Sequence, residues 1–97
     1  MRIQYIQINK VMTENEKIIY RRIDELLWSN WDPIGINDTP EARDEYQSYL
    51  PEIFALKINN AGRDKIANSL YKIETNNMGL DGNIIHCQEI ADKILSL

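Results

Sequence analysis

Apolar residues recur every three or four positions along most of this chain of 97 residues, which is the spacing of one face of an α-helix. The first such run begins at Thr13, which with Glu16 three positions later forms a capping box. Asp32-Pro33 ends the run, because the residue before a proline is pushed out of the helical region. The apolar stripe of this first predicted helix consists of Ile19, Ile23, Leu26 and Leu27.

A second helix is predicted from Thr39-Pro40, a favourable N-cap followed by a proline at the first helical position. Its apolar spacing continues through Pro51, so we predict a single helix that bends at this proline and ends at Gly62. The residues that keep the spacing are Ala42, Tyr46, Tyr49, Ile53 and Leu56.

Two further helices complete the predicted fold. One is expected from Arg63 to Met78, with Gly79-Leu80 as a Schellman ending, and the other starts at about Asn83. Four helices with short connections predict an all-α, compact antiparallel four-helix bundle that forms a single domain over residues 1–97.

The first eleven residues do not fit the helical pattern. Residues 3–8 alternate imperfectly between apolar and polar, which predicts either a short N-terminal strand or a loose arm. Met12 and the residues after it also look like an ordinary bacterial start, so residues 1–11 are alternatively an N-terminal extension.

The charge of the chain is concentrated in one segment. The net charge is -4, but residues 32–52 contain six acids against Arg43 alone, so this segment carries -5 and the remainder +1. An acidic segment on a nearly neutral body argues against nucleic acid or an anionic membrane as the partner. It favours the basic surface of another protein.

The sequence also predicts where the protein works. No apolar run approaches the ~20 residues of a membrane-spanning helix, and the start lacks the apolar stretch of a secretory signal. Cys87 is the single cysteine, which excludes an internal disulfide and fits a reducing compartment. We therefore predict a cytoplasmic protein.

Catalytic motifs are scarce. One histidine and one cysteine, adjacent at His86-Cys87, cannot supply the four ligands of a closed zinc site, and no glycine-rich phosphate loop is present. Cys87 falls on an apolar stripe and is predicted to be a core residue. Glu41 and Glu45 form the one carboxylate pair, but nothing adds a ligand histidine or a second matched pair. We expect no enzyme activity, no cofactor and no metal; a metal-dependent carboxylate enzyme is the weaker alternative.

The acidic segment is the candidate binding surface. On a continuous helix, Glu41, Glu45 and Glu52 would share one stripe, with Tyr46 and Tyr49 at its border. Aromatic rings beside carboxylates suit a basic partner, although the tyrosines are alternatively core residues and the acids serve solubility. The predicted partner-binding residues are Asp38, Glu41, Asp44, Glu45, Tyr46, Tyr49 and Glu52.

Two resemblances bear on function. The stretches W-D-P-I-G-I at residues 31–36, E-Y-Q-S-Y-L-P at 45–51 and M-G-L at 78–80 resemble small uncharacterised bacterial helical proteins with a W-D-P-x-G loop. That likeness implies a small α-helical domain without an established activity, and residues 1–11 depart from its pattern.

In size and charge the chain is also similar to the immunity proteins of bacterial contact-dependent inhibition and related toxin systems. This second likeness implies an inhibitor of one cognate toxin with a basic surface, such as a nuclease whose nucleic-acid groove a carboxylate stripe could block. The alternative is a non-enzymatic helical domain of unknown role that acts as an adaptor or a homo-oligomer.

Overall fold

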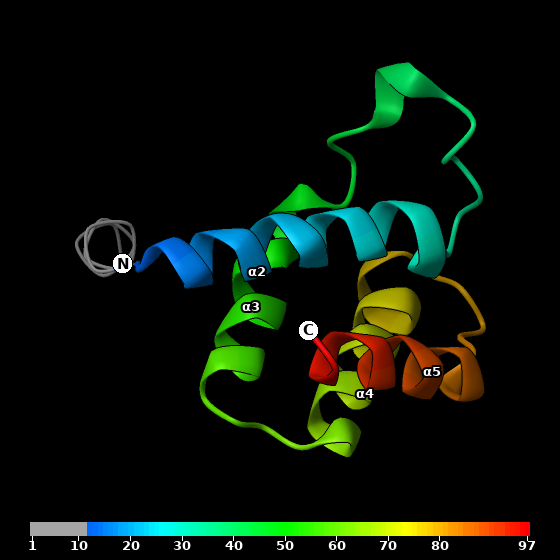
Figure 1. The fold of residues 1–97 in the computed structure, drawn as a ribbon. Helices are drawn as coiled ribbons and strands as arrows, with labels where there is room; N and C mark the ends of the chain where they lie inside the picture. Colours follow the sequence, from blue (N-terminus) through cyan, green and yellow to red (C-terminus); the bar gives the residue numbers. More distant parts are fainter. Residues whose placement is uncertain (1–11) are drawn as a thin grey trace.

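The computed structural model describes residues 12–97, and this part of the chain contains helices, turns and loops but no strand. The α-helices are α2 (Glu14–Leu26), α3 (Leu50–Ile58), α4 (Arg63–Lys72) and α5 (Ile84–Leu95). Figure 1 shows α5 running below α2 in the opposite direction, while α3 crosses them steeply. The all-α bundle is therefore confirmed, and the predicted N-terminal strand or arm lies outside the described residues.

The capping box at the start of α2 forms as predicted. The Thr13 hydroxyl accepts the backbone N–H of Glu16 at 3.0 Å, and the Glu16 carboxylate accepts the backbone N–H of Thr13 at 2.9 Å. At the other end a π-helical turn, η1 (Leu27–Trp31), extends the helix until Asp32 takes a left-handed conformation with φ of 33°. The helix thus ends at Asp32-Pro33, where the sequence predicted it.

A single hydrophobic core joins all four α-helices. Along α2 and η1 the buried positions are Ile23, Leu27 and Trp31, four residues apart, so that one face is buried over two turns. Cys87 is fully buried, which confirms its prediction as a core residue. The remaining core residues are Tyr46, Leu50, Ile53, Phe54, Ile66, Ala67, Leu70, Ile73, Ile90, Ala91 and Ile94.

The prediction of one long helix bent at Pro51 is wrong. Residues 40–49 form two short 3₁₀ turns, η2 (Pro40–Ala42) and η3 (Gln47–Tyr49), and α3 begins only at Leu50. Pro51 therefore occupies the second position of α3, where its missing N–H leaves no hydrogen bond unmade. The apolar spacing predicted an α-helix here because Tyr46 and Tyr49 both face the core, but they do so from turns.

The last two α-helices meet through a shared loop. A π-helical turn, η4 (Ile73–Asn77), follows α4, and the Leu80 N–H then donates to the backbone carbonyl of Glu74 at 2.9 Å. Asn83 caps α5 by accepting the His86 backbone N–H at 3.0 Å. The predicted limits of both helices agree with these positions. No helix of the described part is long and apolar enough to cross a membrane.

The segment between α2 and α3 projects from the bundle, at the top of Figure 1. We call residues 32–49 the lobe. They contain most of the acidic residues that the sequence singled out. Most of the candidate binding surface therefore lies on the lobe.

Candidate functional site

Asp32 organises the start of the lobe. Its carboxylate accepts the backbone N–H groups of Ile36 at 2.8 Å and Asn37 at 3.3 Å, and the Tyr46 hydroxyl at 2.7 Å. The Tyr46 oxygen in turn accepts the Ile34 N–H at 3.3 Å. One carboxylate thus joins both sides of the lobe, which explains the role of the aspartate in the W-D-P-x-G stretch.

Arg43 connects the lobe to α2. Its guanidinium makes two hydrogen bonds to the Asp24 carboxylate, at 3.0 and 3.2 Å, and one to Glu25 at 3.1 Å. The same group lies over the Trp28 ring, 5.4 Å from the ring centroid. The only base of the acidic segment is therefore used internally, and it leaves the neighbouring acids of the lobe uncompensated.

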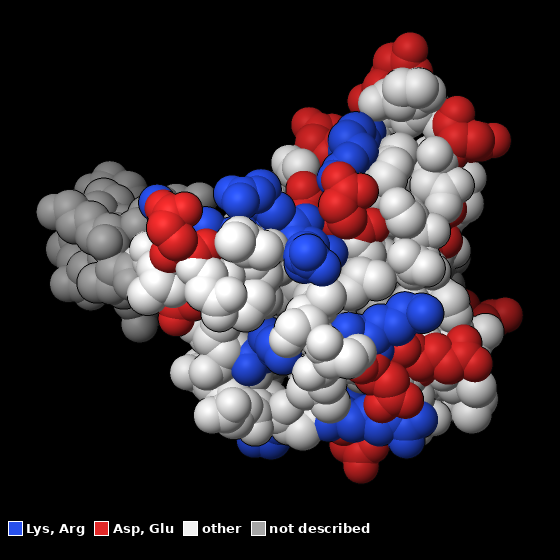
Figure 2. Space-filling view, in the orientation of Figure 1, with Lys and Arg blue, Asp and Glu red and all other residues white. Residues whose placement is uncertain are grey.

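Four acidic residues lie on the exposed surface of the lobe. Their side chains are exposed, and none forms an ion pair with another residue of the described part of the chain. Figure 2 shows acidic side chains gathered on the projecting lobe, above a body that carries basic and acidic side chains together. We call this set the lobe acids; it consists of Asp38, Glu41, Asp44 and Glu45.

The two tyrosines do not border the acids as expected. Tyr46 is only 1% exposed, with its ring against Trp31 at 5.3 Å between centroids, and its hydroxyl is used by Asp32. Burial, followed by the hydrogen bond to Asp32, raises the pKa of Tyr46 above its ordinary value of 10.0. Tyr49 is half-buried with its ring edge against Trp31. Tyr46 therefore belongs to the core and Tyr49 packs against it, which agrees with the alternative that they are core residues and corrects their predicted position at the border of the acids.

Glu52 is separated from the lobe acids. It lies in α3, and its carboxylate accepts the Ser69 hydroxyl of α4 at 2.5 Å. It also lines a groove with Lys65 and Lys72 of α4. Because residues 40–49 are not α-helical, the single stripe expected for Glu41, Glu45 and Glu52 does not exist.

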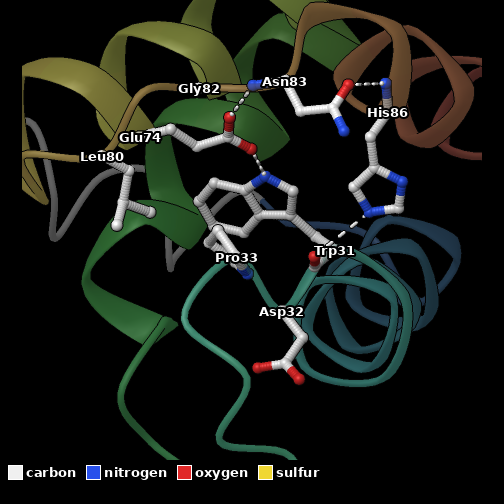
Figure 3. Close-up of a pocket in the computed structure, with 8 residues that line it drawn as sticks. All are labelled: Trp31, Asp32, Pro33, Glu74, Leu80, Gly82, Asn83 and His86. Atoms are coloured by element: carbon white, nitrogen blue, oxygen red, sulfur yellow. Dashed lines mark hydrogen bonds between the residues drawn. The ribbon is translucent and has the colours of Figure 1, made fainter.

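A cleft lies where η1, η4 and the start of α5 meet, with a volume of about 340 Å³ (Figure 3). Glu74 lines it, although its side chain is only 2% exposed. The carboxylate accepts three hydrogen bonds, from the Trp31 indole at 2.7 Å, the Asn83 backbone N–H at 2.9 Å and the Cys87 thiol at 3.2 Å. The residues around the cleft are Trp31, Asp32, Pro33, Glu74, Leu80, Gly82, Asn83 and His86.

His86 and Cys87 have different surroundings, as their adjacent positions on a helix require. The Nε2 atom of His86 lies 3.0 Å from the Asn30 carbonyl oxygen and 3.2 Å from that of Trp31, which links α5 to the end of η1. Burial, followed by the hydrogen bond to Glu74, raises the pKa of the Cys87 thiol to about 12. The thiol is therefore protonated at neutral pH and is not a nucleophile.

The sequence did not single out Glu74 as a functional candidate. The available signal was its place on a helix face, four residues after the buried Leu70 and seven after the buried Ala67. A carboxylate at that spacing is on the apolar stripe and has to find donors inside the protein. The indole N–H of Trp31 is one of those donors.

Comparison with protein-family models, with curated proteins and with solved structures gave no match for this chain. The resemblances to W-D-P-x-G proteins and to immunity proteins thus remain predictions. Among residues 12–97, no three His, Cys, Asp or Glu side chains come together as a metal site. The lobe acids and the cleft at Glu74 are therefore the two candidate functional features of the described residues.

Proposed function

We propose that this protein binds the basic surface of another protein through the lobe acids, and that it does so without catalysis. The observation that carries the proposal is the set of four exposed carboxylates that have no cationic partner within the described chain. Such charges attract an oppositely charged surface and accelerate its association. Their position on a projecting segment leaves them accessible to a partner (Figure 2).

The anchoring of the lobe supports this proposal. The Asp32–Tyr46 hydrogen bond closes the lobe, and the Arg43–Asp24 ion pair ties it to α2. A surface that is ordered before binding loses less conformational entropy when the partner arrives. The lobe is thus suited to a partner with a fixed arrangement of lysines and arginines.

Within this class we propose an immunity protein that neutralises a cognate bacterial toxin. A nuclease toxin has a basic groove for nucleic acid, and carboxylates on a projecting lobe could occupy it in place of phosphates. A small domain with net charge -4 and its negative charge concentrated in one segment suits that role. Fast association matters there, because free toxin harms the producing cell.

The test compares the full chain with a variant that removes three lobe charges, Glu41→Gln with Asp44→Asn and Glu45→Gln. Each protein is tagged and used to capture partners from the cells that make it, and captured proteins are identified by mass spectrometry. We expect the unchanged chain to retain one basic protein that the variant loses. Expression of that protein alone should stop growth, and co-expression of the unchanged chain should restore it.

A matched control removes three exposed acids outside the lobe, by Glu14→Gln, Asp64→Asn and Asp81→Asn. Its net charge equals that of the lobe variant, so it separates the position of the charges from their number. Equal capture by the lobe variant and the control would contradict a role for the lobe. Capture of a partner without toxicity would instead favour an adaptor, and recovery of the chain itself would favour a homo-oligomer.

A further inference from the structure

The buried carboxylate of Glu74 lacks a counter-charge. Its three hydrogen-bond partners, the Trp31 indole, the Cys87 thiol and a backbone N–H, are all neutral donors. Such a set of donors suits the ionised carboxylate, because none of them needs a proton from it. No lysine, arginine or histidine of residues 12–97 forms an ion pair with Glu74. Buried charges in proteins are normally paired, so a positive charge is missing here.

The cleft beside Glu74 is the route by which such a charge can arrive. Glu74 lines the cleft together with Asp32, although the carboxylate of Asp32 points away from Glu74 (Figure 3) and accepts its hydrogen bonds from residues of the lobe. Two backbone carbonyls at the end of η1, those of Asn30 and Trp31, point toward His86 at its border. The carboxyl end of a helix carries partial negative charge, but the amino end of α5 at the same cleft carries partial positive charge. The attraction of the cleft for a cation therefore depends on the carboxylate of Glu74.

The size and walls of the cleft indicate the kind of cation. A volume of about 340 Å³ is at the lower end of the range of about 300–1,000 Å³ for small-ligand pockets. Two aromatic residues are among its lining residues, but Trp31 is only 1% exposed, so His86 offers the accessible ring (Figure 3). A planar guanidinium packs against aromatic rings and pairs with carboxylates better than an ammonium does. No metal-ligand set is present in residues 12–97, which favours an organic cation over a metal ion.

We propose that this cleft receives the guanidinium of an arginine side chain of the bound partner. This inference rests on the proposed function, because a basic partner supplies the arginine. Asp32 belongs both to the cleft and to the start of the lobe, so one partner can contact the lobe acids and the cleft together. The arginine supplies the positive charge that Glu74 lacks.

The experiment titrates the full chain, labelled with ¹⁵N, with N-acetyl-arginine amide as the probe. The readout is the indole N–H signal of Trp31, which donates to Glu74. Trp28 provides an internal control, because its ring lies against Arg43 and is not part of the cleft. We expect a saturable shift at Trp31 with millimolar affinity and none at Trp28. The neutral analogue N-acetyl-citrulline amide should produce no saturable shift.

Variants assign the response to Glu74. Glu74→Gln keeps the size of the side chain and removes its charge, and should weaken binding of the probe at least about tenfold. Leu80→Lys places a cation at the cleft without changing Glu74, so it should block the probe, whereas Leu80→Met should not. The Leu80 pair keeps the test decisive if Glu74→Gln does not fold. Unchanged affinity in Leu80→Lys, or equal shifts with the citrulline probe, would overturn the proposal.

The lobe variant separates this inference from the proposed function. Removal of charge at Glu41, Asp44 and Glu45 should leave binding of the arginine probe unchanged within about twofold, since these residues do not line the cleft. If the probe fails to bind while the lobe variant still loses its partner, the cleft proposal is wrong and the proposed function remains. If the probe binds but the lobe variant keeps its partner, the role proposed for the lobe acids is wrong and the cleft remains a binding site for arginine.

Discussion

Asp32 takes a left-handed backbone conformation and places its carboxylate where it accepts three hydrogen bonds from the lobe. The shortest of these comes from the Tyr46 hydroxyl at 2.7 Å, and Tyr46 is only 1% exposed. A hydrogen bond to an ionised group is stronger than one between neutral groups. At the scale of single residues, this pair closes the lobe, and the Tyr46 ring packs against Trp31 of the bundle.

Tyr46→Phe removes that hydrogen bond and keeps the ring. We expect the free energy of unfolding to fall by about 1.5–3 kcal/mol, because a hydrogen bond to a charged group is lost and the Ile34 N–H loses its acceptor. Denaturant unfolding measures the change. Tyr49→Phe serves as the control and should lie within about 0.5 kcal/mol of the unchanged chain. Equal stability of the two variants would contradict the role given to Tyr46.

Stability should also fall at alkaline pH. The raised pKa of Cys87, about 12 against 9.0 for the unperturbed thiol, means that the unfolded chain loses this proton first. Stability from this group is complete below pH 9 and is lost as pH rises toward the folded value, by at most about 1.4 kcal/mol per pH unit. Cys87→Ala should show a shallower decline between pH 9.0 and about 10. Parallel declines in both proteins would contradict this assignment.

The sequence predicts the environment of some of these residues but not of others. Cys87 was predicted correctly, because its place on an apolar stripe decides its burial without knowledge of the partners. The bonds made by Glu74 and Asp32 could not be predicted. They join positions from 4 to 43 residues apart, and the longest of these pairings exist only after the helices have packed.

At the scale of elements, the local signals for helix ends were reliable. The capping box at Thr13 and the N-cap at Asn83 act within three residues, so the sequence contains all of their information. The single bent helix was predicted wrongly because a proline with apolar spacing on both sides fits either a bent helix or a helix start. The tertiary contacts of Arg43 and Tyr46 hold residues 40–49 in turns and decide the matter.

Pro51→Ala distinguishes the two arrangements. At the second position of α3 the proline breaks no hydrogen bond, so its replacement should lower the free energy of unfolding by only about 0.4–1 kcal/mol, through greater freedom of the unfolded chain. Circular dichroism should show no gain in helix content. Increased helicity together with greater stability would indicate a continuous helix through residues 40–58 instead.

The loop that leads into α5 depends on Gly82. Its φ is 84°, and a Cβ atom would come within 2.5 Å of Tyr71 Cε1 and 2.7 Å of Thr75 Cγ2. Gly82→Ala should therefore cost about 2–4 kcal/mol from backbone strain and overpacking together. Gly35→Ala has a similar φ but open space, and should cost only about 1–2 kcal/mol. Thermal unfolding compares them, and a Gly82 cost no larger than the Gly35 cost would refute the close contact.

At the scale of the whole molecule, charge and shape coincide. Most of the -5 segment identified in the sequence projects from the bundle: the lobe, residues 32–49, carries five of its six acids and Arg43, a net charge of -4 (Figures 1 and 2). Its charge could be counted from the sequence. Its division into four exposed lobe acids, two inward-facing tyrosines and a distant Glu52 could not, because that division follows from turns rather than from a helix.

The central claim is that the lobe acids guide a basic partner into contact. Its most direct measurement is the association rate of the captured partner by stopped-flow fluorescence, over salt concentrations from about 50 mM to 1 M, where screening between exposed charges becomes nearly complete. The unchanged chain should lose most of its rate as salt rises, whereas the lobe variant should start slow and depend only weakly on salt. The control variant with three acids removed elsewhere should resemble the unchanged chain. Identical salt dependence for all three proteins would contradict the account.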